Sequence, residues 1–334
     1  MVYIYKKVIH GKPYYYLRIS RRVKGKIIVK DIAYLGNNAL ELEEKLKKLP
    51  SYNSEIREAY RNIKKFIQGE YYLKKARELE LKDNPYLNKN FLEEIEAIRL
   101  HFNGHFLRQD KKIIDEAYKN FLIDFAFNTA SLEGNTITLA EASKLLRENL
   151  TPKNRTLREI YDLQNTEKVF FGIISPNREI GHDFIAWIHD KLMENIDNRK
   201  GYRQHDIRVF KSNFEVTPFP YIKADIEILL KWHKEHEHRL HPLVLAGIFH
   251  QKFEKIHPFS DGNGRTGRMI VSYMLMKKNY PPLIIKKSKR ASYLDTLALG
   301  NEADLNSVEP KYYKDLIEYL AEELISTYWS NFNV

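Results

Sequence analysis

The sequence predicts a mainly α-helical protein with a small N-terminal antiparallel β module and a β-hairpin flap. Aromatic and β-branched residues are dense at positions 3–35, with turn signals at Gly11-Lys12-Pro13 and Lys24-Gly25-Lys26. From Ala39 onward, apolar residues recur at helical spacing among charged residues. After position 113, one short aromatic stretch at 206–222 breaks this period and contains two prolines, so we expect a hairpin there.

We expect three segments along the chain. Residues 1–36 form a basic β-meander, with strands at about 2–9, 14–22 and 27–34. Residues 37–112 form a helical connecting region, and residues 113–334 form a helical domain. Within that domain, apolar residues at 114–133 repeat at three- and four-residue intervals and predict an amphipathic helix.

Composition excludes several classes of function. The 334 residues contain no cysteine, which rules out disulfides, thiolate zinc sites and cysteine nucleophiles. The longest apolar stretches, such as Leu243 to Phe249, fall far short of the roughly 20 residues that span a bilayer. The N-terminus lacks the apolar region of a signal peptide. We therefore expect a soluble, cytoplasmic protein without a membrane partner.

The net charge of +11 is concentrated at the N-terminus. Residues 1–35 carry one acid, Asp31, against nine basic residues: Lys6, Lys7, Lys12, Arg18, Arg21, Arg22, Lys24, Lys26 and Lys30. Charge interleaved with tyrosines suits a nucleic-acid partner for residues 1–36. A sheet that docks protein targets or a partner subunit accounts for the same pattern, and both alternatives stay open, as does a homodimer.

The segment from His257 to Arg268 combines glycines, arginines, an acid and a histidine. Predicted helices precede and follow it, and the second begins near Gly264. Gly262 and Gly264 allow a tight turn and a close approach of the backbone to a ligand. Free N–H groups at a helix start form an anion site, to which Arg265 and Arg268 add guanidinium groups from one face.

An acid and a histidine complete this segment. Asp261 places a carboxylate among the cationic groups, an arrangement that suits Mg²⁺ shared with a nucleotide. His257, at the other end of the loop, is the group able to accept a proton near neutral pH. Together these residues indicate phosphate-ester chemistry with a base, a metal ligand, an anion site and a charge clamp.

The segment resembles the motif His-x-Phe-x-(Asp/Glu)-Gly-Asn-Gly-Arg-x-x-Arg of Fic-domain proteins at every fixed position, and the resemblance extends over about residues 113–325. It implies a Fic-type helical core and transfer of AMP from ATP to a Ser, Thr or Tyr hydroxyl of a protein, with release of pyrophosphate. Relatives called Doc toxins carry Lys in this loop and transfer phosphate instead. Gly264 and Arg265 favour AMP transfer here.

The resemblance also implies a role for each motif position. It makes His257 the base and Asp261 the Mg²⁺ ligand. The remaining motif residues would bind the phosphates of ATP: Gly262, Asn263 and Gly264 as the cradle, with Asn263 near the α-phosphate, and Arg265 and Arg268 on the β- and γ-phosphates.

A second motif lies at the end of the helix predicted for 114–133. Glu133 falls in the last turn, where the helix dipole disfavours an anion, and Gly134 suits the position that ends a helix. Thr129 to Gly134 resembles the inhibitory motif (Ser/Thr)-x-x-x-Glu-(Gly/Asn) of Fic proteins. The resemblance implies that Glu133 pairs with Arg268 and keeps it from the γ-phosphate, so the enzyme is autoinhibited.

Two further regions contain candidate binding residues. Val209, Phe210 and Phe214, in the predicted flap, suit strand pairing with a target peptide. Tyr293 resembles a position that packs near adenine in relatives, although a tyrosine there is equally often part of a core. Removal of AMP with the help of Glu133, transfer of another nucleotide, and a nucleic-acid-associated regulator remain as alternative functions.

Overall fold

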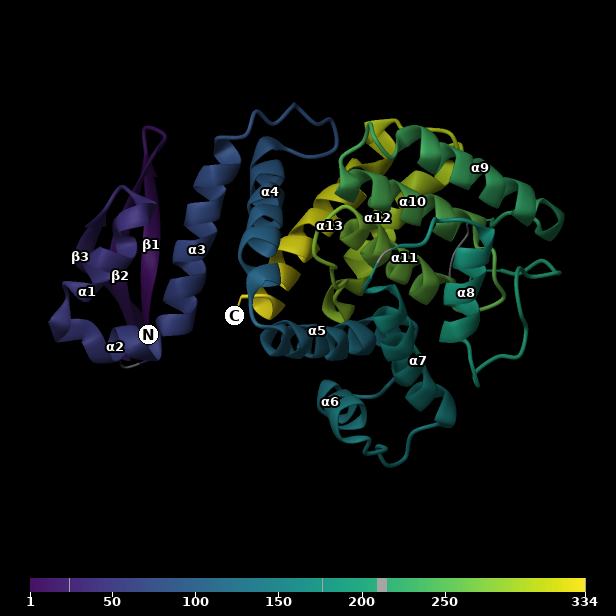
Figure 1. Cartoon of the computed structure of the whole chain (residues 1–334), viewed down its shortest axis with the longest axis horizontal. Helices are drawn as coiled ribbons and strands as arrows, with labels where there is room; N and C mark the ends of the chain where they lie inside the picture. The colour runs from purple at the N-terminus through teal and green to yellow at the C-terminus, as the bar shows by residue number, and fades with distance from the viewer. Residues whose placement is uncertain (24, 176, 209–214, 334) are drawn as a thin grey trace.

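The computed structural model describes residues 1–23, 25–175, 177–208 and 215–333. A three-stranded antiparallel sheet lies at one end of the molecule and a helical domain at the other, with two long helices side by side between them (Figure 1). The strands are β1 (Val2–Ile9), β2 (Lys12–Val23) and β3 (Lys26–Gly36), in the order β1-β2-β3. The predicted β-meander is confirmed.

One face of the sheet is apolar because the strands alternate. Val2 and Ile4 of β1, and Tyr15 and Leu17 of β2, are buried, while their neighbours point the other way. They share a core with α1 (Leu42–Lys47), α2 (Asn53–Glu58) and α3 (Tyr60–Arg77). Helices from the segment predicted to be a connecting region therefore cover one face of the sheet.

Two adjacent helices, α3 and α4 (Lys89–Gly104), connect this core to the helical domain. α3 packs along α4, which in turn packs on the C-terminal helix α13 (Pro310–Asn331) (Figure 1). Glu70 of α3 accepts hydrogen bonds from Lys6 Nζ at 2.7 Å and from the Tyr15 hydroxyl at 2.6 Å. These bonds connect the inner face of the sheet to the helix that leads into the domain.

The helical domain is built around one extensive core. α10 (Pro242–Ile256) and α11 (Asn263–Lys277) lie at its centre, and almost every residue of α11 is buried. The surrounding helices are α5 (Lys111–Leu132), α6 (Leu139–Glu148), α7 (Leu157–Ile173), α8 (His182–Leu192), α9 (Ile222–His236) and α12 (Arg290–Leu299). The prediction of a mainly α fold with a helical core is confirmed.

The hairpin predicted for 206–222 is described only in part. Residues 206–208 and 215–218 are not in strands, and Phe219–Tyr221 forms a 3₁₀ helix that leads into α9. Pro218 and Pro220 account for this difference, since proline has no N–H to donate to a strand ladder. Residues 209–214, with the predicted flap positions Val209, Phe210 and Phe214, lie outside the described residues.

Within the described part of the chain, no helix combines the length and the apolar character that a membrane span requires.

The closest approach between α10 and α11 depends on Gly267. A Cβ atom at this position would lie 2.6 Å from Nδ1 of His250 and 3.0 Å from Oε1 of Glu254. His250 is fully buried, and its Nε2 and the hydroxyl of Tyr293 share a hydrogen bond, so the ring has little room to retreat.

We therefore expect Gly267→Ala to lower the free energy of unfolding by about 1–3 kcal/mol, as overpacking of a core does. Denaturant unfolding of the full chain measures this. Gly69→Ala is the matched control, because Gly69 is also helical and its added Cβ would make an ordinary 3.6 Å contact with Trp329. That control should be neutral or stabilise α3 by about 0.5–1 kcal/mol. Equal effects of the two substitutions would contradict the close approach.

Candidate active site

The loop at 257–262 connects α10 to α11 and is shaped by two left-handed residues; it is called the catalytic loop here because of the role predicted for His257. α10 ends at His257, whose φ is +52°, and α11 begins after Gly262, whose φ is +77°. The buried side chain of Asn263 closes the loop: Oδ1 accepts from the Phe259 N–H at 2.9 Å, and Nδ2 donates to the Phe259 carbonyl at 2.8 Å. Both predicted helices are present, and their boundaries fall within a residue or two of the expected positions.

A buried arginine holds the other side of this loop. Arg203 donates from Nε to the His257 carbonyl at 3.0 Å, and its own backbone N–H donates to the Pro258 carbonyl at 3.0 Å. Its remaining nitrogens bond the carbonyls of His205 and Thr217. Arg203 thus ties the catalytic loop to the two described ends of the segment around 206–218. Arg203 belongs to the Gly201-Tyr202-Arg203 triplet in the region that resembles Fic domains, but the sequence did not predict its role in holding this loop.

His257 is arranged to act as a neutral base. Its Nδ1 lies 3.3 Å from the Glu254 carbonyl, which can only accept, so this nitrogen carries the proton and Nε2 keeps its lone pair. Burial lowers the pKa of His257, while the Glu254 carbonyl and the charge of Glu133 partly oppose that effect. The imidazole is therefore uncharged at neutral pH and able to accept a proton.

Glu254 is a largely buried acid next to that imidazole. Its Oε2 lies 3.9 Å from Nδ1 of His257, and its Oε1 has no hydrogen-bond partner among the described residues. Burial raises the pKa of Glu254 to about 8, against a smaller lowering by Arg268. The carboxyl is thus mainly protonated at pH 7. The periodicity of the sequence alone does not reveal this carboxyl, whose Oε1 has no hydrogen-bond partner beside His257.

The start of α11 has the properties of an anion site. The N–H groups of Asn263, Gly264 and Arg265 have no acceptor within the described ranges of the chain, and they belong to the positive end of the helix dipole. Gly264 leaves room above this turn, and the Glu133 carboxylate occupies that room: a Cβ on Gly264 would collide with its Oε1. An acid from α5 therefore lies directly over the predicted phosphate cradle.

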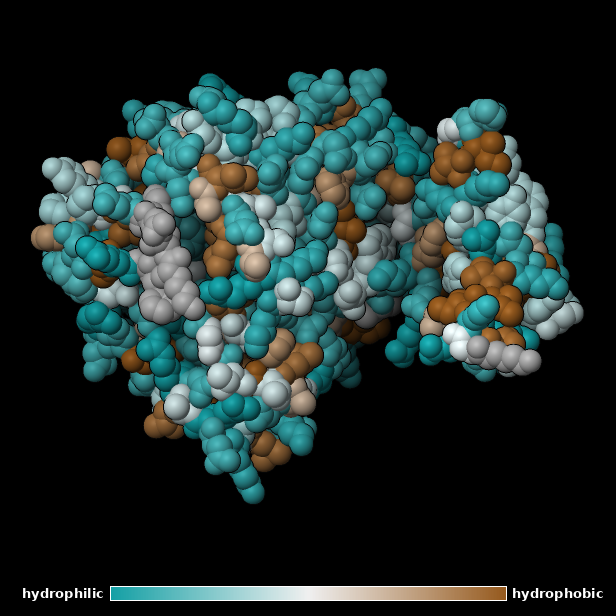
Figure 2. Space-filling view, turned by 180° about the vertical axis from the view of Figure 1, so that it is seen from behind, coloured by the Kyte–Doolittle hydropathy of each residue, from teal (hydrophilic) through white to brown (hydrophobic). Residues whose placement is uncertain are grey.

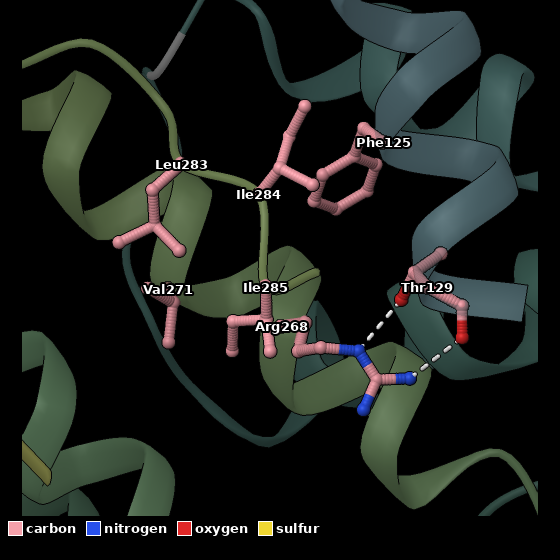
Figure 3. A pocket seen from close by; sticks show the side chains of 7 residues that line it. All are labelled: Phe125, Thr129, Arg268, Val271, Leu283, Ile284 and Ile285. Carbon is pink, nitrogen blue, oxygen red and sulfur yellow. Dashed lines mark hydrogen bonds between the residues drawn. The ribbon is translucent and has the colours of Figure 1, made fainter. Parts of the chain in front are cut away.

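Arg268 is held by the end of α5. It donates from Nε to the Thr129 hydroxyl at 2.6 Å, and from Nη2 to the Thr129 carbonyl at 3.0 Å and to Glu133 Oε1 at 2.6 Å. Figure 3 shows the two bonds to Thr129 beside a small apolar pocket. That pocket is lined by Phe125, Val271, Leu283, Ile284 and Ile285, with Thr129 and Arg268.

The helix end that presents Glu133 is well defined. Gly134 has φ +98°, its N–H donates to the Ser131 carbonyl, and the Asn135 N–H donates to the Ala130 carbonyl. This pattern is the Schellman motif, which satisfies the last carbonyls of a helix. The predicted helix end is thus confirmed, and Glu133 is brought to Arg268 as the resemblance implied.

Arg265 and Asp261, the first arginine and the acid of the motif, each have a charged partner on α7. Arg265 is 2% exposed and pairs with the buried Asp162, and its Nη2 lies 3.3 Å from Asp261 Oδ1. Arg158, also on α7, pairs with the other oxygen of Asp261. Burial alone would raise the pKa of Asp261, but the two arginines hold it below its usual range. Arg158 and Asp162 are four residues apart and so lie on one face of α7. Their partners Asp261 and Arg265 are about a hundred residues away in the sequence, so these pairs could not be predicted from local spacing.

Tyr293 lies in the same region but is buried. Its hydroxyl is within 2.5 Å of Nε2 of His250, and its ring is parallel to the imidazole at a centroid distance of 6.0 Å. Its side chain is 2% exposed. The structure thus brings Tyr293 against the core of α10, behind Arg268, while its predicted contact with adenine stays a prediction.

A cavity of about 240 Å³ opens beside Asp261. Its walls come from the catalytic loop, α8 and the segment at 197–205: His189, Asp197, Arg199, Lys200, Gly201, Tyr202, Arg203, Gln204, His205, Ser260 and Asp261. Arg199, Lys200 and Arg203 make this lining basic, so positive charge continues along the side of the loop that faces away from α5.

Comparison with known proteins agrees with this geometry. Residues 179–275, which include the whole catalytic loop and the first turns of α11, match the Fic/DOC family. The chain carries a Fic domain. The matched region of this Fic domain runs from α8 to α11 and contains His257, Asp261 and both arginines.

Relatives of the Fic domain are found among curated proteins. "Protein adenylyltransferase Fic" of Drosophila ananassae is 30% identical over 234 residues, covering 66% of this chain and 44% of the relative. The protein of the same name from Drosophila virilis is 32% identical over 216 residues, covering 62% and 42%. The chain thus spans less than half the length of these relatives.

Solved structures share the fold. A Fic domain containing signaling protein from Bacteroides thetaiotaomicron has a TM-score of 0.64 at 23% identity, covering 70% of this chain and 94% of that one. Fic-1 from C. elegans has a TM-score of 0.59 at 21% identity, covering 86% and 76%. These similarities establish the Fic fold of the helical domain.

We expect the imidazole of His257 to titrate below the usual value of about 6.5, because burial penalises its charged form. It stays neutral as the pH falls to 6.5 and gains its proton only at more acid pH. NMR titration of ¹⁵N-histidine-labelled full chain measures this, with His257→Asn identifying the signal among twelve histidines.

The same titration examines Glu254. Since the pKa of Glu254 is about 8, the His257 signal should shift a second time near that pH, and Glu254→Gln should remove this second step only. A His257 pKa at or above 6.5, or a second step that persists in Glu254→Gln, would contradict this description of the site.

Proposed function

We propose that this protein transfers AMP from Mg·ATP to a Ser, Thr or Tyr hydroxyl of a protein, itself included, and that it is autoinhibited through Glu133. The observation that carries the proposal is a neutral imidazole at one end of a loop whose other end is a free helix N-terminus with two buried arginines. The similarity to protein adenylyltransferases supports it.

The reaction follows from the positions of these groups. The target hydroxyl oxygen attacks the α-phosphorus of ATP, and its proton moves to Nε2 of His257. The bond from the α-phosphorus to the bridging oxygen breaks, and pyrophosphate leaves with that electron pair. The N–H groups of α11, with Arg265 and Arg268, stabilise the charge on the phosphates. Gly262 and Gly264 keep side chains away from the approaching phosphate, and the amide of Asn263 preserves the loop.

Mg²⁺ fits this site through Asp261. The Asp261 side chain is 33% exposed, and its partner Arg158 is exposed enough to be displaced by a bound cation. In the described part of the chain no cluster of three His, Cys, Asp or Glu residues could hold a metal alone. Mg²⁺ commonly binds one or two carboxylates plus substrate phosphates, so Asp261 alone is a sufficient protein contribution. When bound, Mg²⁺ neutralises phosphate charge.

Inhibition would follow because the Glu133 carboxylate and the γ-phosphate of ATP compete for the same site beside Gly264 and Arg268. The Glu133 carboxylate lies over Gly264 and binds Arg268, so a γ-phosphate bound there would meet both its negative charge and its volume. The Glu133 side chain is 40% exposed, whereas Arg268 is 5% exposed. The glutamate can therefore move into solvent, and the buried arginine stays in the site.

Removal of AMP is the second candidate. The observation that favours it is the nearness of an ionised carboxylate, that of Glu133, to the loop that carries His257. Such an acid can orient a water molecule toward an AMP-modified side chain. Incubating labelled, AMP-modified protein with the unmodified wild-type chain and with Glu133→Gly tests it: loss of label only with the wild type supports removal.

We expect Glu133→Gly to increase labelling from [α-³²P]ATP and Mg²⁺ by at least about tenfold, since it frees Arg268 from a charge-assisted bond of about 1.5–3 kcal/mol. His257→Ala in the same background should abolish labelling. Autoradiography of the full-length protein measures both. Glu148→Gly is the matched control, because Glu148 is an exposed glutamate at the end of the neighbouring helix α6 and should leave labelling at the wild-type level.

Parallel reactions with [γ-³²P]ATP identify the group that moves. Label from the α position alone supports AMP transfer, whereas label from the γ position would mean phosphate transfer and overturn the proposal. Strong labelling by the wild type, equal to that of Glu133→Gly, would contradict the autoinhibition and leave AMP transfer standing.

A further inference from the structure

The outer face of the N-terminal sheet carries a row of tyrosines. Tyr5 of β1 pairs with Tyr16 of β2, and Tyr16 pairs with Tyr34 of β3. Residues directly opposite each other on adjacent strands lie on the same face, so these three rings follow one another across the sheet. Tyr14 and Tyr3 flank the row at two-residue spacing on their strands.

The rings form a partly exposed surface that other aromatic rings can use. Tyr34 is 55% exposed; its ring lies 5.3 Å from that of Tyr16 and 6.5 Å from that of Tyr14, centroid to centroid. The guanidinium of Arg18 lies 3.4 Å over the ring of Tyr5. The buried side chains Val2, Ile4, Tyr15 and Leu17 all lie on the opposite face, so this aromatic row is not part of the core.

Basic side chains surround the row and leave a surplus of positive charge. Lys7, Lys12 and Arg22 are exposed on this face and have no ion pair within the described ranges. The single acid of the sheet, Asp31, is paired with Arg18. Exposed apolar residues, among them Ile27 and Val29, extend the surface, and Figure 2 shows brown areas at both ends of this module, at the right of that view.

We propose that this outer face binds single-stranded nucleic acid, with bases stacked on Tyr16, on Tyr34 and on the Arg18 guanidinium that covers Tyr5, and with the phosphate backbone near Lys7, Lys12 and Arg22. A three-stranded sheet with exposed aromatic rings and flanking cations is suited to a ligand that offers flat rings and a regular line of negative charge. The site is separate from the catalytic loop, so the inference does not depend on AMP transfer.

Other anionic ligands match this face less well. In a duplex, the base faces are stacked on one another and cannot reach the tyrosines. An acidic peptide would satisfy the lysines and arginine but has no regular series of rings to place on the row. The combination of rings and charge therefore favours a single strand.

Binding of a fluorescein-labelled oligothymidylate of about 12 nucleotides to the full chain, measured by fluorescence polarisation, tests the proposal. We expect binding that weakens between about 50 and 200 mM salt. Tyr16→Ala with Tyr34→Ala should weaken binding at least about tenfold, whereas Tyr16→Phe with Tyr34→Phe should retain it, because stacking needs the ring and not the hydroxyl. Replacing Lys7, Lys12 and Arg22 with Gln should flatten the salt dependence.

Tyr60→Ala is the matched control, since Tyr60 is a 58% exposed tyrosine on α3 of the same module and should leave binding unchanged. The double Phe variant and circular dichroism show whether the sheet is still folded. Absence of binding at low salt would overturn the proposal. So would binding that ignores the alanine substitutions, equal affinity for a duplex, or a tyrosine-dependent preference for a polyglutamate peptide over the oligonucleotide.

Discussion

The ion pair between Glu133 and Arg268 is the interaction that brings two distant parts of the chain together at the candidate active site. It joins the end of α5 to the second turn of α11, and Thr129 reinforces it with two further bonds to the same guanidinium. A buried arginine needs its donors satisfied, because an unpaired charge in a low dielectric is costly. The end of α5 supplies that anion, and its Schellman motif holds the glutamate in place.

The catalytic loop itself is kept rigid by bonds that do not involve the reacting groups. Asn263 closes it from within, and Arg203 holds the carbonyls of His257 and Pro258 from outside. These bonds determine where the imidazole points, so the reactive side chains need little reorganisation. Arg265 is fixed in the same way by Asp162, whereas Glu133 and Arg158 are the more exposed partners of Arg268 and Asp261.

Local sequence signals were sufficient for the elements and for the catalytic loop. Dense aromatic and β-branched residues in the strands, helical periodicity, and the position of Gly134 after Glu133 predicted features that the structure contains. The partners of those residues were not predictable, because Arg158, Asp162 and Arg203 reach the loop from positions some fifty to a hundred residues away. The 3₁₀ helix at Phe219–Tyr221 was missed because the aromatic content suggested a strand, although its prolines opposed one.

Gly264 restricts how this protein can change over generations. The empty space above its Cα admits the Glu133 carboxylate, and it is the same space that the proposed nucleotide phosphate requires. A side chain gained at position 264 would collide with the Glu133 carboxylate and with a phosphate bound in the same place. Under the proposed inhibition, descendants of this gene could lose the restraint through changes on α5, where Glu133 and Thr129 lie, but not through position 264, so activity and restraint would vary separately on separate helices.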